Sequence, residues 1–274
     1  MVKSGKKLKR QNNFSIQLQN AKLHDYPLLI EIYGGPGSNK VTSSWKKSYT
    51  QTYMVSHHNV IVASVDARGS GRRGNKMMHA TYKQIGQFER EDASDFAAYL
   101  LMMYPALDPK RVGIWGWSFG GYATTHSLLY PDSTFTTGVA VAPLVSRFNY
   151  DSMHTERYMD LPENNKLNYD KCSILNQDLE NMRNKQYAII SGTMDDNVHF
   201  QVRVSVDFRV KLGESSRWSS SLYCTTRNFG QIVMGKTLPT LQRFIVHALI
   251  FISECSTNFK RIDQKRNRFP KHCK

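Results

Sequence analysis

"RVGIWGWSFGGYATTHSLL", residues 111–129, is the stretch that decides the fold. An apolar run typical of a buried strand ends near Gly116, and a segment with helical spacing begins at about Gly120. The pattern Gly-x-Ser-x-Gly between a strand and a helix is typical of a nucleophile elbow, because the glycines let the backbone turn tightly and present the serine hydroxyl. Ser118 is therefore the candidate nucleophile. The alternative is a glycine-rich turn that contains a serine by chance.

Similar strand-then-loop segments lie on both sides of this stretch. Residues 26–37 and 59–74 are apolar runs that end in glycine-rich loops, and residues 136–145 and 186–200 hold two further buried strands. Residues 86–105 read as a helix with its apolar side formed by Phe88, Phe96, Tyr99, Leu100 and Met103. Apolar strands alternating with amphipathic helices predict an α/β fold, an α/β-hydrolase with a mostly parallel central sheet and helices on both faces.

The ends of two other strands carry candidate partners of Ser118. Asp195 and Asp196 directly follow the strand near residue 190, where a hydrolase of this kind needs its acid. The alternative is a pair of solvated loop carboxylates. Tyr33 ends the first strand, where a phenol can donate to a substrate oxyanion, although a packing tyrosine fits the pattern equally well.

Six segments then indicate a family. They are YPLLIEIYGGPG, VDARGSGRRG, GIWGWSFGGY, VAVAPLVSRFNYDS, TERYMDLPE and GTMDDNVHFQ, and they span residues 26–201 in this order. In order and spacing they resemble the catalytic domain of the dipeptidyl peptidase IV type in the prolyl oligopeptidase family of serine peptidases. The resemblance implies an α/β-hydrolase that releases N-terminal dipeptides after proline or alanine, and it implies no cofactor or metal.

The resemblance also assigns roles to residues. It implies that Ser118 is the nucleophile and Asp195 the triad acid, with the Phe119 amide and the Tyr33 hydroxyl as the oxyanion hole. It places Asn197 and Arg157 near the substrate backbone. The remaining implied residues line the pocket for a substrate proline: Val145, Phe148, Tyr150, His154 and Val198. Relatives usually have tyrosine at the position of His154.

The base of the triad has no clear counterpart. Relatives carry it as His-Gly after the acid, and the best match here, TTRNFGQI, has Phe229 at that position. No histidine lies between His199 and His247. Phenylalanine can neither accept nor return a proton. The sequence thus predicts an impaired serine peptidase. The alternatives are an inactive α/β-hydrolase that serves as a binding or regulatory module, and a truncated or mis-spliced product.

The chain of 274 residues divides into a main domain and two basic ends. We expect a poorly ordered leader over 1–25, a hydrolase domain over 26–255 with a divergent part at 201–243, and a basic tail over 256–274. Residues 1–12 and 256–274 together carry +11 of the net charge of +15, so the basic character belongs to the ends and no nucleic-acid partner is predicted. We also expect no β-propeller, which relatives carry ahead of this domain.

The remaining expectations concern cysteines, membranes and partners. The four cysteines show no metal-ligand spacing, and Thr137 stands where many extracellular relatives have the partner of a cysteine like Cys255. No apolar run reaches the ~18–20 residues that span a bilayer. The resemblance suggests a homodimer and a peptide substrate with penultimate proline or alanine, and the sequence leaves the compartment open.

Overall fold

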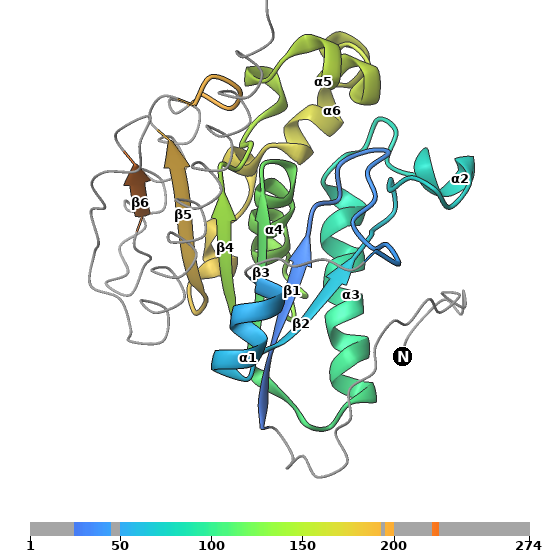
Figure 1. Cartoon of the computed structure of the whole chain (residues 1–274). Coiled ribbons are helices and arrows are strands. Elements are labelled where there is room, and N and C mark those ends of the chain that lie inside the picture. Colours follow the sequence, from blue (N-terminus) through green and yellow to red (C-terminus); the bar gives the residue numbers. More distant parts are fainter. Residues whose placement is uncertain (1–24, 45–49, 193–194, 200–220, 225–274) are drawn as a thin grey trace, which may run out of the picture.

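The computed structural model describes residues 25–44, 50–192, 195–199 and 221–224. In this part of the chain, six strands form one sheet in the order β2-β1-β3-β4-β5-β6, and every neighbouring pair is parallel (Figure 1). This confirms the predicted α/β architecture. The strands are β1 (Tyr26–Ile32), β2 (Ile61–Val65), β3 (Leu107–Trp117), β4 (Thr137–Val141), β5 (Gln186–Gly192) and β6 (Ser221–Cys224).

Helices connect the strands, as a parallel sheet requires. The α-helices are α1 (Val55–His58), α2 (Asn75–Met78), α3 (Gln87–Met103), α4 (Phe119–Leu129), α5 (Ser152–Met159) and α6 (Pro162–Cys172). Four short turns of other helical type are η1 (Thr50–Met54), η2 (Arg147–Asn149), η3 (Ile174–Asn176) and η4 (Leu179–Met182). Both α5 and α6 lie beyond the carboxyl ends of the strands (Figure 1).

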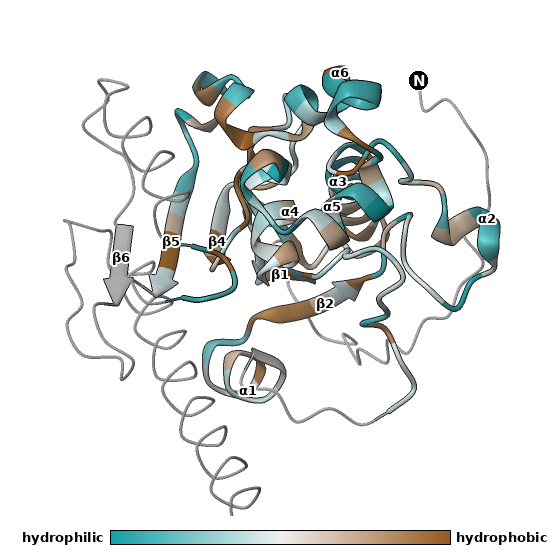
Figure 2. Cartoon of the chain, turned by 90° about the horizontal axis from the view of Figure 1, so that it is seen from above, coloured by the Kyte–Doolittle hydropathy of each residue, from teal (hydrophilic) through white to brown (hydrophobic). Residues whose placement is uncertain are grey.

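The sheet separates two hydrophobic clusters. Because side chains alternate along a strand, Leu28, Ile30 and Ile32 of β1 join the larger cluster beneath α3 and α4, whereas Leu29 joins the smaller one on the opposite face. Figure 2 shows α1 on that opposite side, away from α3, α4, α5 and α6. Helix α4 is buried over its whole length, so the segment that begins with Phe119 is part of the core.

The predicted apolar side of α3 is confirmed only in part, since Leu100 is buried and Phe96 packs against the core. Tyr99 and Met103 are exposed, whereas the buried positions are Glu89, Ala93, Ser94, Ala97 and Leu100. Small side chains let α3 lie close to α4, and large ones at these positions would hold the two helices apart. The place and extent of the helix are therefore predicted correctly, whereas its buried side is predicted only in part.

Several expectations fall outside the described residues. These include the leader at 1–24, most of the divergent part at 201–243, Phe229, Cys255 and the basic tail. Strand β6 lies within this divergent part and forms the edge of the sheet beside β5.

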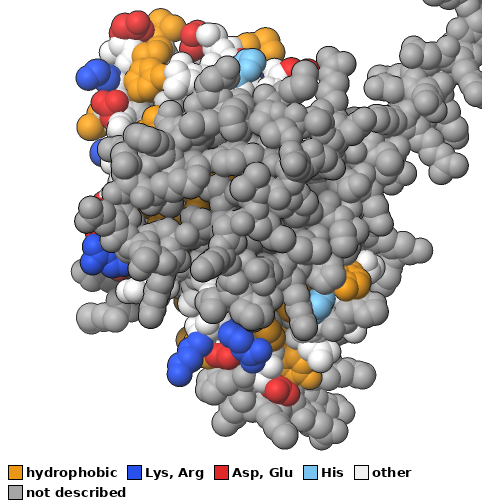
Figure 3. Space-filling model, turned by 90° about the vertical axis from the view of Figure 1, so that its left-hand side faces the viewer, with side chains coloured by type: hydrophobic (Ala, Val, Ile, Leu, Met, Phe, Trp, Pro, Cys, Tyr) orange, Lys and Arg blue, Asp and Glu red, His pale blue; other side chains and the backbone are white. Residues whose placement is uncertain are grey.

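The described residues were compared with the requirements of a membrane span and of a metal site. Among the helices that the structure describes, none is long and apolar enough to cross a membrane. Within the same residues, histidine, cysteine, aspartate and glutamate form no group of three or more that could hold a metal ion. In Figure 3, hydrophobic, acidic and basic side chains are intermixed on the described surface near the upper edge.

Candidate active site

Ser118 is the residue between the end of β3 and the start of α4. Its backbone has φ 58° and ψ −115°, a conformation that L-residues other than glycine rarely adopt and that costs about 1–3 kcal/mol. The Ser118 amide donates to the carbonyl of Val141, the last residue of β4, at 2.8 Å. The strained turn expected of a nucleophile elbow is therefore present, and β4 helps to hold it.

The two glycines of the motif allow this turn because backbone atoms fill the space where side chains would stand. A Cβ on Gly116 would lie 2.5 Å from the carbonyl carbon of Gly120, and one on Gly120 would lie 2.3 Å from the carbonyl oxygen of Ile32. Real Cβ contacts are longer than 3.0 Å. The close approach of β1, β3 and α4 thus fixes where Ser118 stands.

Tyr33 and Phe119, the two predicted oxyanion donors, lie side by side. Tyr33 follows β1 and Phe119 follows Ser118 at the end of β3, and these two strands pair in the sheet. The centroids of the two rings are 6.2 Å apart, and Tyr33 is 38% exposed while Phe119 is buried. The Phe119 amide is at the first position of α4, where backbone N–H groups have no partner within the helix. The Tyr33 ring and the Phe119 amide therefore both lie at the turn that carries Ser118.

Asp195 follows β5, which β4 separates from β3. Its Oδ1 accepts hydrogen bonds from the amides of Asn197 at 3.1 Å and Val198 at 3.0 Å. Asp195 is half-buried and Asp196 is exposed. Asp195 thus holds the loop that carries Asn197 and Val198, at the same edge of the sheet as Ser118.

Most of the predicted pocket residues lie together. The Tyr150 hydroxyl donates to Oδ1 of Asn197 at 3.1 Å, and the rings of Tyr150 and His154 meet edge to face at 5.7 Å. Val145 and Val198 are buried. Phe148 is 49% exposed, with its ring 4.9 Å from that of Tyr169. The segment 145–154 and the Asp195 loop therefore meet through a direct hydrogen bond.

Arg157 lies on the same helix as His154. It is exposed on α5, and its guanidinium carbon is 5.7 Å from the centroid of the Tyr158 ring. The Tyr158 ring lies 5.0 Å from the ring of His154, so Arg157 borders the predicted pocket residues.

Three histidines lie near the site, His126, His154 and the exposed His199 of the Asp195 loop, and within the described residues none of them forms a hydrogen bond with Ser118. His126 is buried on α4, its Nε2 is 2.9 Å from the carbonyl oxygen of Cys172, and burial lowers its pKa to about 3. Burial, and then the charge of Arg147, lower the pKa of His154, so its imidazole is neutral at pH 7. His126 and His154 both pack against neighbouring groups, His126 beside Cys172 and His154 beside Tyr150.

Two charged residues of the site are absent from the predicted set. Arg147 is 1% exposed and Glu89 is 0% exposed, and both lie under the residues that follow β1 and β3. The only sequence signal for Glu89 was an acid near the start of a helix. Arg147 had none, although it stands between the predicted pocket residues Val145 and Phe148.

Burial raises the pKa of Glu89 from 4.5 to about 7, against the opposing effects of the Gly86 amide, which donates to Oε2 at 2.9 Å, and of Arg147. The folded protein therefore binds this proton more tightly than the unfolded chain, whose glutamate pKa is near 4.5. The contribution to stability is complete below pH 4.5 and is lost as the pH rises through 7.

Glu89→Gln is expected to remove this pH dependence. Between pH 5 and pH 8 the wild-type free energy of unfolding should fall relative to that of the variant by up to about 3 kcal/mol. Urea unfolding at the two pH values measures the difference, with the exposed Glu180→Gln as control. Parallel pH profiles for wild type and Glu89→Gln would contradict the prediction.

A profile of the prolyl oligopeptidase family matches residues 45–219. The chain is 41% identical over 232 residues to dipeptidyl peptidase 4 of Felis catus, which covers 84% of this chain and 29% of that protein. It is 47% identical over 182 residues to dipeptidyl peptidase 4 of Sus scrofa, and this match covers 66% of this chain and 23% of that protein.

The fold is also similar to a solved structure. The crystal structure of Porphyromonas gingivalis dipeptidyl peptidase 4 matches 83% of this chain and 31% of its own, with a TM-score of 0.69 and 33% identity. The chain thus spans less than a third of the length of these relatives.

Proposed function

The chain belongs to the prolyl oligopeptidase family, and from this premise we propose that it is a dipeptidyl-peptidase-like serine hydrolase domain with strongly impaired turnover. Ser118 is the nucleophile, Asp195 the acid, and Tyr33 and the Phe119 amide the oxyanion donors. Phe229 takes the place of the base. The observation that supports the nucleophile best is the strained backbone of Ser118 at the turn from β3 to α4, since residues in such conformations cluster at active sites.

The substrate in this proposal is a peptide with proline or alanine as its second residue. A proline ring fits a pocket walled by Val145, Val198 and aromatic side chains, since such walls offer apolar contact and no charge. The hydrogen bond between Tyr150 and Asn197 ties the two halves of the pocket together. Asn197 is exposed there, and the amino group of its side chain can face the substrate backbone.

A binding module is the second candidate function, and the same pocket favours it. None of the contacts among Tyr150, His154 and Asn197 needs a triad base. A domain that lacks the base can therefore still hold a peptide N-terminus without cleaving it. In this case the chain captures its ligand and releases it unchanged.

Labelling by a fluorophosphonate probe separates the two functions. We expect the purified full chain to label slowly, at least about 10³-fold below a base-containing serine hydrolase, and to show no detectable turnover of a Gly-Pro reporter amide. Ser118→Ala should abolish the labelling that remains. Fast labelling that depends on Ser118, together with turnover, would mean that a base exists and that the chain is an active peptidase.

A further inference from the structure

Arg147 is a buried guanidinium with an unusual environment. Its side chain is 1% exposed, and within the part of the chain that the structure describes, Nε, Nη1 and Nη2 form no well-aligned hydrogen bond, although the guanidinium interacts with the Tyr122 hydroxyl. Burying a charge without hydrogen bonds is strongly unfavourable, and such groups in native proteins call for an explanation. The surroundings of Arg147 provide one.

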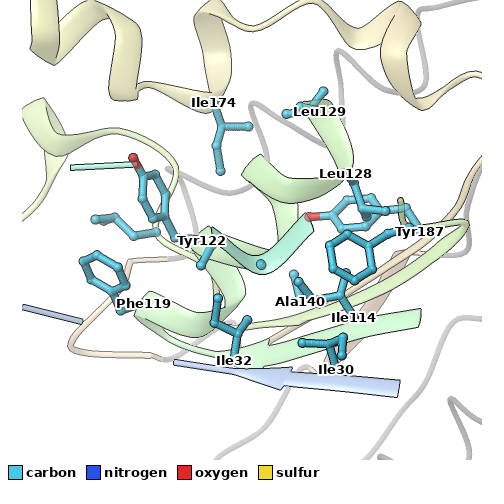
Figure 4. Close-up of a cluster of buried hydrophobic side chains, with 14 of the residues drawn as sticks. Ile30, Ile32, Ile114, Phe119, Tyr122, Leu128, Leu129, Ala140, Ile174 and Tyr187 are labelled. Atoms are coloured by element: carbon cyan, nitrogen blue, oxygen red, sulfur yellow. The ribbon is translucent and has the colours of Figure 1, made fainter. Parts of the chain in front are cut away.

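Two aromatic rings of α4 hold the guanidinium. Its central carbon lies 4.8 Å from the centroid of the Phe119 ring and 4.9 Å from that of Tyr122. The two rings meet edge to face at 5.5 Å, and they occupy neighbouring positions at one end of the core cluster (Figure 4). A cation is attracted to the face of an aromatic ring, most strongly where water is excluded. Arg147 thus fixes Phe119 from one side.

Glu89 is the acidic residue that interacts electrostatically with Arg147. It is fully buried at the start of α3, and Oε1 has no hydrogen-bond partner in the described structure. A Cβ placed on Gly34 would lie 3.4 Å from Cγ of Glu89 and 3.8 Å from Cε1 of Phe119. Glu89 therefore supports the turn after Tyr33 and the ring of Phe119 together.

We propose that Arg147 is a positioning residue: held between the Phe119 and Tyr122 rings and balanced by Glu89, it fixes the backbone that carries the Phe119 amide and the turn that carries Tyr33. The inference deepens the proposed function, because these two groups are its oxyanion donors. Arg147 touches no substrate atom in this role. It acts on the donors through Phe119, and on the pocket through its neighbours Val145 and Phe148.

In this arrangement the site responds to the proton of the Glu89 carboxyl group. The groups that face Glu89 are Arg147 from η2, Tyr122 from α4, Cys172 from α6 and Asp92 from its own helix. Burial moves the pKa of Tyr122 well above 10 and that of Cys172 to about 11, away from neutrality. The pKa of Glu89 is about 7, so this carboxyl gains its charge near neutral pH and changes the balance with Arg147.

An amide titration tests the coupling without any need for activity. The full chain is labelled with ¹⁵N-phenylalanine, which gives 13 amide signals, and Phe119→Tyr identifies the signal of interest. We expect the Phe119 amide to titrate with a midpoint near pH 7 in the wild type. Glu89→Gln should abolish this step, and Arg147→Met should shift the signal and move the step to higher pH, because the charge of Arg147 no longer lowers the pKa of Glu89.

An exposed ion pair provides matched controls. Arg183 and Glu180 bind each other at 2.8 Å on the surface, so Arg183→Met and Glu180→Gln repeat both substitutions away from the site. Both controls should keep the step near pH 7. A Phe119 amide that stays constant from pH 5.5 to 8.5 in the wild type, or that titrates unchanged in Glu89→Gln, would overturn the proposal. The isosteric Glu89→Gln decides the matter even if Arg147→Met fails to fold.

A ligand comparison tests the consequence for the site. A Gly-boroPro probe forms a tetrahedral adduct with a serine and so needs the oxyanion donors, whereas the dipeptide Gly-Pro needs only the pocket. We expect Glu89→Gln and Arg147→Met to weaken the boronate at least about 10-fold while Gly-Pro affinity stays within 2-fold. Equal losses for both ligands would mean a purely structural role and would overturn the proposal. Absence of any adduct in the wild type would count against the proposed function alone, and the amide titration still decides the coupling.

Discussion

Phe229→His is expected to raise the turnover of a Gly-Pro reporter amide by about 10³- to 10⁶-fold. In a comparable triad, loss of the base costs about 10⁶ in turnover, because no other group takes the proton of the serine or returns one to the leaving amine. Ser118, Tyr33 and Asp195 already stand at the carboxyl edge of the sheet. A histidine that reaches both Ser118 and Asp195 would complete the set.

Two controls make this result specific. Asn228→His places the same side chain one position earlier and is expected to gain no activity, and Ser118→Ala combined with Phe229→His should abolish the gain. The readouts are steady-state hydrolysis and the rate of fluorophosphonate labelling. A folded Phe229→His chain without gain would show that residue 229 does not occupy the position of the base.

The choice of residue 229 depends on matching TTRNFGQI to a motif of the relatives. The predictions of the elbow and of most of the fold depend on local sequence patterns instead. The strands that carry Tyr33, Ser118 and Asp195 are continuous apolar runs that stop at glycine or at polar residues, and each of these signals lies within a few residues. The Gly-x-Ser-x-Gly turn is equally local, because the residues that allow it are two positions from the serine. Such features were predicted correctly.

What the sequence did not predict depends on contacts between distant segments. The buried side of α3 consists of Ala93, Ala97 and their neighbours because α4 approaches closely, and periodicity favours large apolar residues instead. Arg147 and Glu89 were missed for a related reason. A charged residue is ordinarily expected at the surface, and only the fold shows that Phe119 and Tyr122 enclose this arginine.

Gly116→Ala is expected to destabilise the fold by more than about 4 kcal/mol. The new Cβ would lie 2.5 Å from the carbonyl carbon and oxygen of Gly120 and from the carbonyl oxygen of Ile32. All three are backbone atoms of the core, so no side-chain rotation can relieve the clash, and α4 would have to move away from β1. That movement would carry Phe119 off Arg147 and would release the strain at Ser118.

The matched control is Gly192→Ala at the end of β5, where a Cβ would meet its nearest neighbour, Cβ of Asp195, at an ordinary 3.7 Å. We expect this variant to unfold within about 1 kcal/mol of the wild type. Urea unfolding followed by near-ultraviolet circular dichroism measures both, and it also reports the tryptophans that flank Gly116. Equal stability of Gly116→Ala and the wild type would mean that β1, β3 and α4 are not packed this closely. The conformation of Ser118 would then lose its structural cause, since the same contacts that exclude a side chain at residue 116 hold the serine in its strained turn.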